Sequence, residues 1–414
     1  MKGFRWTVLL IMVICSHTNT SQAQDFEVLA GPIYGHYTDS SRHFWMAVRA
    51  NQQIPNSEWI SSFNADLYAY FEIHKGIRVK KVTRSNLVLG HYILVQGIVE
   101  QQPPVNADNN LTFLLGSCAF PYPFMFWQAG DREFIFDVMA EHEKDFMIWM
   151  GDNVYYLNGE WRKRQKMHQK NLRMRFNTHL DTFLKSCPQY ATWDDHDFGD
   201  NNAGSKHRYK YAALEIFKQY WNNPYAGLDT VPGVFCHFSQ KDADFFLLDA
   251  RFHAKDSTML GTAQTQWLQE QLKKSTANFK FIVSGTQILA DNPSGEDMGD
   301  YGNEREQLLD FLETEKITGV IFLSGDRHYG ELMKMERETA YPLYEMTSSP
   351  LTSWVNPGYT KKNPLRQSST LALTENFGKI ELLGEGMNRF CRLNLFDKTG
   401  ALLWSRDVFL SDLQ

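Results

Sequence analysis

Cysteine is scarce in this chain: its 414 residues include five cysteines. No two of them form a C-x-x-C pair, and the content is too low for a disulfide-built scaffold. We expect at most one disulfide among the four cysteines that follow the N-terminal segment, which are Cys118, Cys187, Cys236 and Cys391. Glycine and proline, with 27 and 14 residues, are not abundant enough for a collagen-like or disordered chain.

An excess of positive charge is also absent. The chain has 42 basic and 48 acidic residues, a net charge of −6, so no nucleic-acid partner is expected. Beyond the N-terminal segment no apolar run is long enough for a transmembrane helix. Hydrophobic residues make up 43% of the chain and aromatic residues 14%, which indicates a globular protein of two or three domains. The oligomeric state has no readable signal in the sequence.

The N-terminus has the three parts of a secretory signal peptide. Lys2 and Arg5 form a basic start, residues 6–15 are mostly apolar, and Ser21-Gln22-Ala23 places small residues at a cleavage site. The pattern predicts a signal peptide over residues 1–23 and a secreted or periplasmic protein.

Residues 24–107 are rich in aromatic and β-branched residues separated by turn formers. Strands are predicted at Arg42–Ala50, Phe63–Ile73 and His91–Val99, which together favour a small all-β sandwich domain. Gln101–Asn110 combines a proline pair with polar residues and is interpreted as a linker.

Residues 108–414 alternate short apolar runs with helix-like segments, which predicts a layered α/β core. The predicted helices are Asp131–Lys144, Glu160–Leu184, His207–Trp221, Gln264–Lys274 and Asn303–Thr314. The C-terminal part returns to β-like pieces, with a hairpin turn at Asp397-Lys398-Thr399-Gly400.

Polar side chains follow five of the apolar runs. These residues are Cys118, Asp152, the run Asp194-Asp195-His196-Asp197, Gln287, and the pair Asp326 and His328. Ligands bind outside the carboxyl ends of strands in open α/β sheets, so the five strand ends predict one shared site. A thiol, several carboxylates, two imidazoles and an amide are suitable ligands for metal ions.

Each of these motifs also has a simpler interpretation. A lone cysteine such as Cys118 is often a small buried hydrophobic residue, and Asp152 after glycine could cap a loop. The Asp194–Asp197 run is harder to explain this way, because its carboxylates repel one another unless cations neutralise them. Asp326 and His328, two positions apart, share one face of an extended segment.

These segments resemble the ordered motifs of the PhoD-like (alkaline phosphatase D) metallophosphatases, within the calcineurin-like phosphoesterase superfamily. The matching segments are GSC at 116–118, GDNVYY at 151–156, WDDHDFGDN at 193–201, SGTQ at 284–287 and SGDRH at 324–328. The resemblance implies a four-layer αββα sandwich at 108–414, preceded by a fibronectin-like or immunoglobulin-like β domain.

The resemblance also implies the metal ligands. Cys118, Asp152, Tyr155 and His328 would hold the first metal, and Asp152 would bridge to a second site completed by Asp195, Gln287 and Asp326. Family members use ferric iron with calcium, and Zn²⁺, Mn²⁺ or Mg²⁺ are alternatives. A thiolate and a phenolate suit a highly charged metal, whereas carboxylate and amide oxygens suit calcium, magnesium or manganese.

The sequence departs from the family pattern at one position, and at two others the motif leaves a choice between neighbouring residues. Leu157 stands where many relatives have an aspartate that helps to hold calcium. Asp200 and Asn201 both follow the WDDHD segment where relatives often have an asparagine ligand, and Asn201 is the metal candidate. The phenolate is assigned to Tyr155 rather than Tyr156 by the register of the motif.

Three further residues are candidates for catalysis. His196 and Asp197 would stabilise charge or protonate the leaving alkoxide beside the metals. Arg327, between two ligand candidates, would hold a phosphate oxygen or form an outward salt bridge.

The predicted function is an exported metal-dependent phosphatase that hydrolyses phosphate monoesters with a metal-activated hydroxide. One alternative is a phosphodiesterase that acts on phospholipids, teichoic-acid-like polymers or nucleotides at the same metals. Another is a non-catalytic binding protein that retains the fold. A serine hydrolase is poorly supported, since the chain has no G-x-S-x-G segment.

Overall fold

The computed structural model describes most of the chain. The described ranges are 26–50, 57–89, 91–101, 109–120, 133–290, 296–356 and 363–414. The predicted signal peptide, most of the predicted linker and the predicted domain boundary at 107/108 lie outside them. Within these ranges, no helix combines the length and the apolar character that a membrane span requires.

The N-terminal part is a four-stranded antiparallel sheet with the order β1-β2-β4-β3. Its elements are β1 (Phe26–Thr38), β2 (Ser41–Ala50), α1 (Ser57–Lys75), β3 (Val79–Val88) and β4 (Tyr92–Glu100). The strands predicted at Arg42–Ala50 and His91–Val99 are confirmed as β2 and β4.

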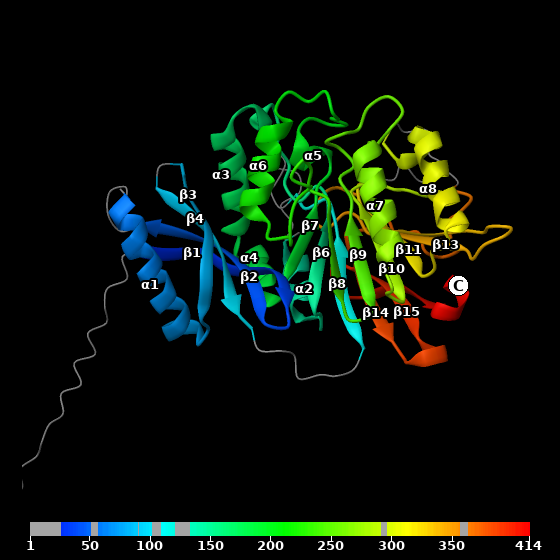
Figure 1. Ribbon diagram of the computed structural model, residues 1–414, viewed down its shortest axis with the longest axis horizontal. Helices are drawn as coiled ribbons and strands as arrows, with labels where there is room; N and C mark the ends of the chain where they lie inside the picture. Colours follow the sequence, from blue (N-terminus) through cyan, green and yellow to red (C-terminus); the bar gives the residue numbers. More distant parts are fainter. Residues whose placement is uncertain are drawn as a thin grey trace, which may run out of the picture.

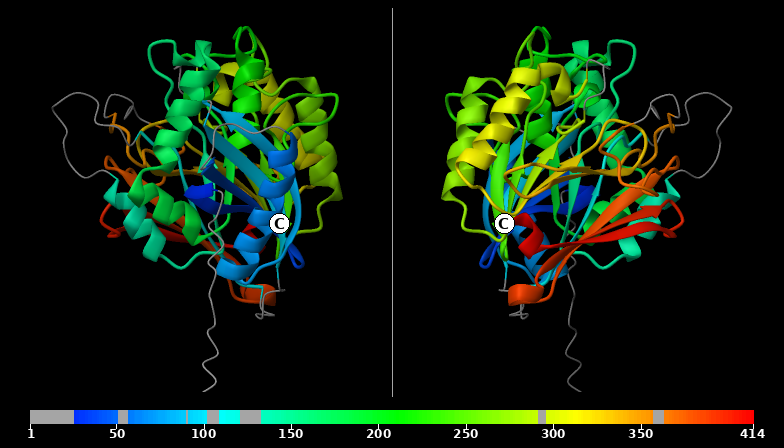
Figure 2. Two further views of the ribbon diagram at one scale, coloured as in Figure 1. Left: turned by 90° about the vertical axis from the view of Figure 1, so that its left-hand side faces the viewer. Right: turned by 90° about the vertical axis from the view of Figure 1, so that its right-hand side faces the viewer.

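The prediction of a third strand at Phe63–Ile73 was wrong, because these residues lie within helix α1. Phe63, Leu67 and Phe71 recur every fourth residue, and all three are buried against the sheet. The left view of Figure 2 shows α1 lying over the N-terminal strands. The layer that covers this sheet is therefore a helix, not the second sheet of an all-β sandwich.

Strand β2 joins the N-terminal sheet to the rest of the molecule. Phe44, Met46 and Val48 face the α1 side, whereas Trp45 and Ala47 belong to the core of the following α/β part. This alternation follows from the two-residue period of a strand. Figure 1 shows the N-terminal strands, in blue, beside the α/β part.

The α/β part contains two six-stranded sheets. One has the order β16-β15-β14-β5-β6-β7 and consists of β5 (Leu111–Gly116), β6 (Phe146–Met150), β7 (Gln189–Thr192), β14 (Asn376–Leu383), β15 (Phe390–Asp397) and β16 (Leu402–Phe409). The other has the order β12-β13-β11-β10-β9-β8 and consists of β8 (Cys236–Gln240), β9 (Ala243–Leu247), β10 (Phe279–Ser284), β11 (Val320–Ser324), β12 (Glu331–Met335) and β13 (Leu343–Thr347).

The two sheets pack face to face with helices on both outer faces. Phe113 and Ile148 of one sheet share a buried core with Phe245 and Phe281 of the other. The helices are α2 (Phe134–Glu141), α3 (Arg164–Arg175), α4 (Thr178–Ser186), α5 (Asp195–Phe198), α6 (Lys210–Tyr220), α7 (Thr262–Lys274) and α8 (Gly302–Thr314). Residues of α2, α3, α4 and α6 pack on the first sheet, and those of α7 and α8 on the second (Figures 1 and 2). The predicted αββα sandwich is confirmed.

The single helix predicted over Glu160–Leu184 is two helices, α3 and α4. They separate at Asn177, whose side chain accepts a hydrogen bond from the backbone N–H of Leu180 and so caps α4. The predicted hairpin turn is confirmed between β15 and β16, where Gly400 has φ 85°. Cys118, Cys187, Cys236 and Cys391 are all buried and free.

Candidate metal centre

The site is built at the ends of strands from both central sheets. β5, β6 and β7 are parallel neighbours, so the residues that follow them emerge at the same edge. The turns after β5 and β6 are tied together, since the N–H of Cys118 donates to Gly151 O over 3.2 Å and that of Ala119 to Asp152 O over 2.9 Å. β11 of the second sheet contributes Asp326 and His328 just beyond its end.

Four of the predicted ligands have left-handed backbone conformations. The φ angles are 57° at Cys118, 52° at Asp152, 67° at Asp326 and 58° at His328. This region is uncommon for residues other than glycine, and strain of this kind tends to occur at functional sites. At each position the chain turns sharply where the strand has ended.

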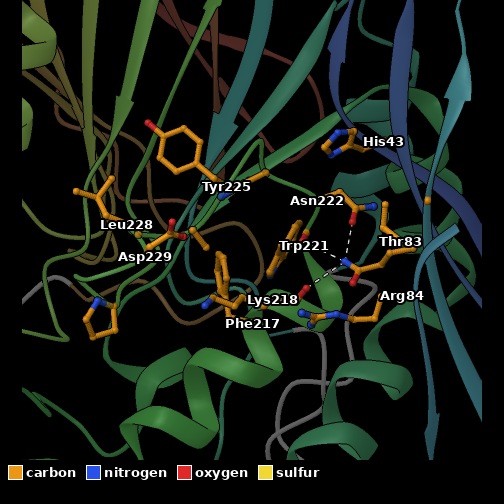
Figure 3. Close-up of a pocket in the computed structure, with 16 residues that line it drawn as sticks. His43, Thr83, Arg84, Phe217, Lys218, Trp221, Asn222, Tyr225, Leu228 and Asp229 are labelled. Atoms are coloured by element: carbon orange, nitrogen blue, oxygen red, sulfur yellow. Dashed lines mark hydrogen bonds between the residues drawn. The ribbon is translucent and has the colours of Figure 1, made fainter. Parts of the chain in front are cut away.

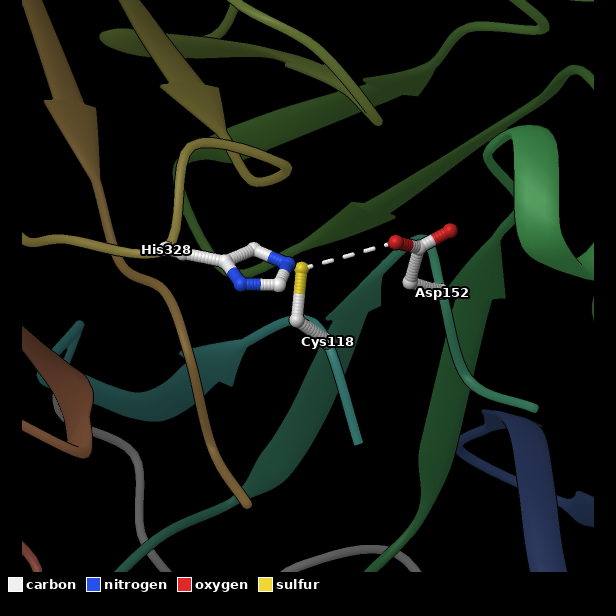
Figure 4. Close-up of side chains that lie close together, drawn as sticks. All are labelled: Cys118, Asp152 and His328. Atoms are coloured by element: carbon white, nitrogen blue, oxygen red, sulfur yellow. Dashed lines mark hydrogen bonds between the residues drawn. The ribbon is translucent and has the colours of Figure 1, made fainter. Parts of the chain in front are cut away.

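The first cluster consists of Cys118, Asp152 and His328, which can each offer a ligand atom within 4.8 Å of the others (Figure 4). The Cys118 thiol lies 3.6 Å from Asp152 Oδ2. Tyr155 adds a fourth group, because its hydroxyl donates to Asp152 Oδ2 over 3.0 Å and lies 3.4 Å from His328 Nε2. A thiol, a carboxylate, a phenol and an imidazole thus surround one point.

Tyr155 and its neighbour Tyr156 face different parts of the protein. Tyr155 stacks on His196, with ring centroids 4.3 Å apart. The Tyr156 hydroxyl instead accepts a 2.7 Å hydrogen bond from the side chain of Asn171 in α3. The structure therefore places Tyr155 in the cluster and Tyr156 outside it.

The orientation of the His328 ring is fixed by a hydrogen bond of the ring nitrogen Nδ1. Its Nδ1 lies 2.6 Å from the carbonyl oxygen of Trp354, which can only accept, so Nδ1 carries the proton. Nε2 then presents its lone pair toward Tyr155 and the cluster. A metal-binding histidine commonly has its other ring nitrogen held in this way.

The second cluster consists of Asp152, Asp195 and His196, again with potential ligand atoms within 4.8 Å of one another. The N–H of His196 donates to Asp152 Oδ1 over 3.1 Å, and the N–H of Asn202 donates to Asp195 Oδ2 over 2.7 Å. Asp195 Oδ1 is buried without a hydrogen-bond partner among the described residues. Asp152 belongs to both clusters, so its carboxylate could offer an oxygen atom to each of them.

A small cavity of about 90 Å³ opens onto these groups. It is lined by Asp152, Asp195, His196, Asn201, Glu296, Asp326, Arg327, His328, Trp354 and Asn356. Asn201 and Asp326 are thus placed at the same opening as the two clusters. Glu296, Trp354 and Asn356 were not predicted, because they come from loops that have no motif of their own.

Burial raises the pKa of several of these groups. Burial, followed by the charges of Asp152 and Asp326, raises the pKa of the Cys118 thiol, and burial raises that of the Tyr155 phenol. Burial also raises the pKa of Asp152, with Asp195 as the next cause. A bound cation reverses this balance and favours the deprotonated forms.

Arg251 supplies internal positive charge to the carboxylate run. Its Nε donates to Asp194 Oδ1, and both side chains are buried. Burial alone would raise the pKa of Asp195, but Arg251, His196 and the Asn202 amide together hold that pKa below its ordinary value. Among the described residues Asp195 Oδ1 has no hydrogen-bond partner, and the lowered pKa keeps this carboxylate charged, which fits a metal-binding site.

Gln287 is not brought to the cavity. Its Nε2 donates to Glu331 Oε1 and to Thr347 Oγ1, both over 2.9 Å, and its side chain is buried between the ends of β12 and β13. Gln287 is absent from the residues that line the cavity. The structure thus gives the amide a role in holding strands together and no visible place in the second metal site.

Asp197 also differs from its predicted position beside the metals. Its carboxylate accepts hydrogen bonds from the N–H groups of Asn153 and Asp194 and does not line the cavity. Burial raises its pKa to about 7. Asp197 therefore holds the turn after β6 against α5.

Arg327 lines the cavity but is already paired. Its Nη1 donates to Glu296 Oε2 over 3.1 Å and to Asp326 Oδ2 over 3.3 Å, and its side chain is 1% exposed. Of the two roles predicted for Arg327, the structure shows the salt bridge, but its partners Glu296 and Asp326 line the cavity instead of lying on the outer surface. Leu157, where relatives have an aspartate, packs on the apolar cluster of Cys118, Phe120 and Tyr155.

Glu345 in β13 anchors the loop that carries Gln287. Its two carboxylate oxygens accept the N–H groups of Ile288, over 2.9 Å, and Leu289, over 2.6 Å. Burial raises the pKa of Glu345 from 4.5 to about 7, so the folded protein retains this proton where the unfolded chain has lost it. Stability should then fall as the pH rises from about 4.5 to about 7, by about 3 kcal/mol from this group.

The test replaces this carboxyl by an amide. Glu345→Gln should lower stability at acidic pH but flatten its pH dependence between about 4.5 and 7, measured as the melting temperature across that window. Glu143→Gln, at an exposed position, is the control and should keep the parent's pH dependence. An unchanged slope in Glu345→Gln would contradict the assignment.

Comparison with solved structures identifies the fold. The solved structure of PhoD aligns with 91% of this chain and 91% of its own, with a TM-score of 0.63 and 15% sequence identity. A purple acid phosphatase, PPD1 from yellow lupin (Lupinus luteus) seeds, aligns with 91% of this chain and 74% of its own, with a TM-score of 0.60 and 9% identity. The fold is therefore a metallophosphatase fold.

Sequence comparison finds similarity to one family. The family described as PhoD-like phosphatase matches residues 238–386. Alkaline phosphatase D from Bacillus subtilis (strain 168) is 23% identical over 310 residues, which cover 61% of this chain and 52% of the relative. The chain thus spans about half the length of that curated relative. The PhoD-like resemblance predicted from the motifs is confirmed.

Proposed function

We propose that this protein is an exported metal-dependent phosphatase that hydrolyses phosphate monoesters. The observation that carries the proposal is the position of Asp152, a buried carboxylate shared by two clusters of metal-binding groups at one small cavity. Two metal ions that share a carboxylate are a recurrent arrangement in phosphoryl-transfer enzymes. The names of the similar proteins, alkaline phosphatase D, PhoD and a purple acid phosphatase, also support a phosphatase.

The donor types suggest two different ions. Cys118, Asp152, Tyr155 and His328 would hold ferric iron, because a thiolate and a phenolate stabilise a highly charged ion. Asp152, Asp195, Asp326 and Asn201 form an oxygen-rich set suited to calcium, with manganese or magnesium as alternatives. When bound, such ions lower the pKa of a water and neutralise phosphoryl oxygens.

The chain's own residues would position the ester and move the proton. The cavity of about 90 Å³ is small, so we expect it to take the phosphoryl group and the alcohol part to extend away from it. His196 lines the cavity near Asp195 and would protonate the leaving alkoxide. Arg327 would hold Asp326 and Glu296 in place through its paired guanidinium.

The first experiment compares a chromogenic phosphate monoester with its bis-ester analogue, together with elemental analysis of protein purified without added metal or chelator. Faster hydrolysis of the monoester and at least two metal equivalents per chain are expected. Preference for the bis-ester would favour a phosphodiesterase. Metal-replete protein without turnover on either ester would contradict an enzymatic function.

The iron assignment predicts a visible colour. Ferric iron bound by the Tyr155 phenolate and the Cys118 thiolate should give a charge-transfer absorption band, and Tyr155→Phe should remove its phenolate part. Tyr156→Phe is the matched control, since that hydroxyl bonds to Asn171 and should leave the spectrum unchanged. A colourless, iron-free and fully active enzyme would contradict this assignment.

Export is part of the proposal and rests on the sequence pattern of residues 1–23. Expression of the full chain should yield a mature protein that begins at Gln24, as determined by N-terminal sequencing of the extracellular or periplasmic fraction. Recovery of the uncleaved chain inside the cell would contradict export.

A further inference from the structure

A second cavity, of about 740 Å³, lies between the N-terminal sheet and the segment that follows α6 (Figure 3). Small-molecule sites typically have volumes of roughly 300–1,000 Å³. Figure 3 shows His43, Thr83 and Arg84 of the N-terminal strands on one side and Tyr225 and Asp229 on the other. No described residue lines both this cavity and the cavity of the candidate metal centre.

Hydrogen bonds hold several of the side chains that line this cavity. Gln96 of β4 donates through Nε2 to Asn222 Oδ1 over 2.7 Å and to Lys218 O over 3.0 Å. The Asn223 side chain is held by Ala191 of β7, accepting from its N–H over 3.0 Å and donating to its carbonyl over 2.7 Å. Side chains that are already held in place lose less conformational entropy when a ligand binds.

The charged side chains at the cavity are unbalanced. Arg84 and Lys218 line it, are half-buried, and have no ion pair with any carboxylate in the described ranges. Among the described residues of the lining Asp229 is the one acidic residue, and it lies across the cavity from Arg84. Burial lowers the pKa of His43, so its ring is neutral. Two unpaired cations at one cavity attract an anion.

One wall offers an aromatic face. Tyr225 is 38% exposed, while its hydroxyl is already used because it accepts the N–H of His237 over 2.9 Å. The neighbouring Trp221 packs inward against Trp149, with ring centroids 5.7 Å apart. The Tyr225 ring is therefore available to pack against an apolar or ring-shaped part of a ligand.

We propose that this cavity is a second binding site, for a small organic anion with one phosphate or phosphonate group and a ring. Arg84 and Lys218 would hold the anionic group, and Tyr225 would pack against the ring. This inference does not depend on the proposed catalytic function.

The test is calorimetric titration of the metal-replete protein with phenylphosphonate, whose carbon–phosphorus bond is not a phosphate ester. The parent should show a binding class that weakens about tenfold or more in Arg84→Ala and in Lys218→Ala, since each removes a charge-assisted hydrogen bond. Methylphosphonate, which lacks the ring, should bind this class more weakly. The class should persist in Asp195→Asn, which separates it from the candidate metal centre.

Lys80→Ala is the matched control. Lys80 lies on the same strand as Arg84, is exposed, donates to Ser40 O and does not line the cavity. Equal weakening in Lys80→Ala and Arg84→Ala would show general electrostatic attraction and overturn the proposal. So would the loss of all binding in Asp195→Asn, or equal affinity for the two phosphonates at this site.

Discussion

Replacing Asp152 by asparagine is expected to lower phosphoesterase turnover by about a thousandfold or more, which corresponds to about 4 kcal/mol of transition-state stabilisation. Asp152 is the carboxylate shared by both clusters, so its loss weakens both metal sites together. An amide has one oxygen to offer and carries no charge. Metal content should therefore fall along with activity.

Stability separates this effect from misfolding. Burial, followed by the nearby Asp195, raises the pKa of Asp152, so the metal-free protein must take up a proton at this carboxyl when it folds, and asparagine removes that cost. The melting temperature of metal-free Asp152→Asn should match or exceed that of the metal-free parent. A chelator should lower the melting temperature of the metal-loaded parent but leave that of the variant unchanged.

Asp256→Asn is the control for this experiment. Asp256 also has a positive φ, 26°, but its side chain is 79% exposed beside Lys206. Activity, metal content and the response to chelator should match the parent. Full metal content and activity in Asp152→Asn would mean that the shared carboxylate does not hold the metals.

The position of the site was predictable because strand order and strand ends are encoded locally. Buried apolar runs predicted β5, β6, β7, β10 and β11, and polar residues at the ends of these strands reach one edge when the strands are parallel. What lies immediately after a strand is a property of the sequence. This is why Cys118, Asp152, Asp195, Asp326 and His328 converge as expected.

The direction in which a side chain points was not predictable in the same way. Gln287 follows β10 as predicted, yet Glu331 and Thr347 of other strands take up its amide nitrogen. Asp197 lies in the same run as Asp195, but two backbone N–H groups turn it away from the cavity. Both outcomes depend on hydrogen-bond partners that are distant in sequence or set by a turn, which composition and spacing do not report.

The same dependence on spatial contacts explains why sequence analysis missed Glu296 and Trp354. Trp354 holds His328 through a backbone carbonyl, which any residue could supply, so its identity carried no signal. Glu296 is recognisable through spatial contacts such as its ion pair with Arg327, which is distant in sequence. Helix α1, in contrast, could have been found: Phe63, Leu67 and Phe71 have helical spacing, which aromatic content concealed.

Replacing His196 by alanine is expected to slow turnover by about a hundredfold or more while both metals remain bound. The ring stacks on Tyr155, with ring centroids 4.3 Å apart, and lines the cavity in which we expect the phosphate ester to bind. Loss of a general acid should affect alkyl phosphates, whose alkoxides need a proton, more than aryl phosphates with an acidic leaving group. The measurement is the ratio of kcat for such a pair in parent and variant.

The second cluster gives His196 an alternative role that the same variant tests. Its ring nitrogen can reach within 4.8 Å of the ligand atoms of Asp152 and Asp195, close enough to serve as a ligand itself. Elemental analysis of His196→Ala decides between the two: retained metal with slow alkyl-phosphate turnover indicates the acid, whereas loss of one metal equivalent and equal slowing of both substrates indicates the ligand. His253→Ala, whose ring bonds to Pro232 O, is the control and should change neither. Parent-like turnover of His196→Ala on both substrates would remove His196 from the reaction.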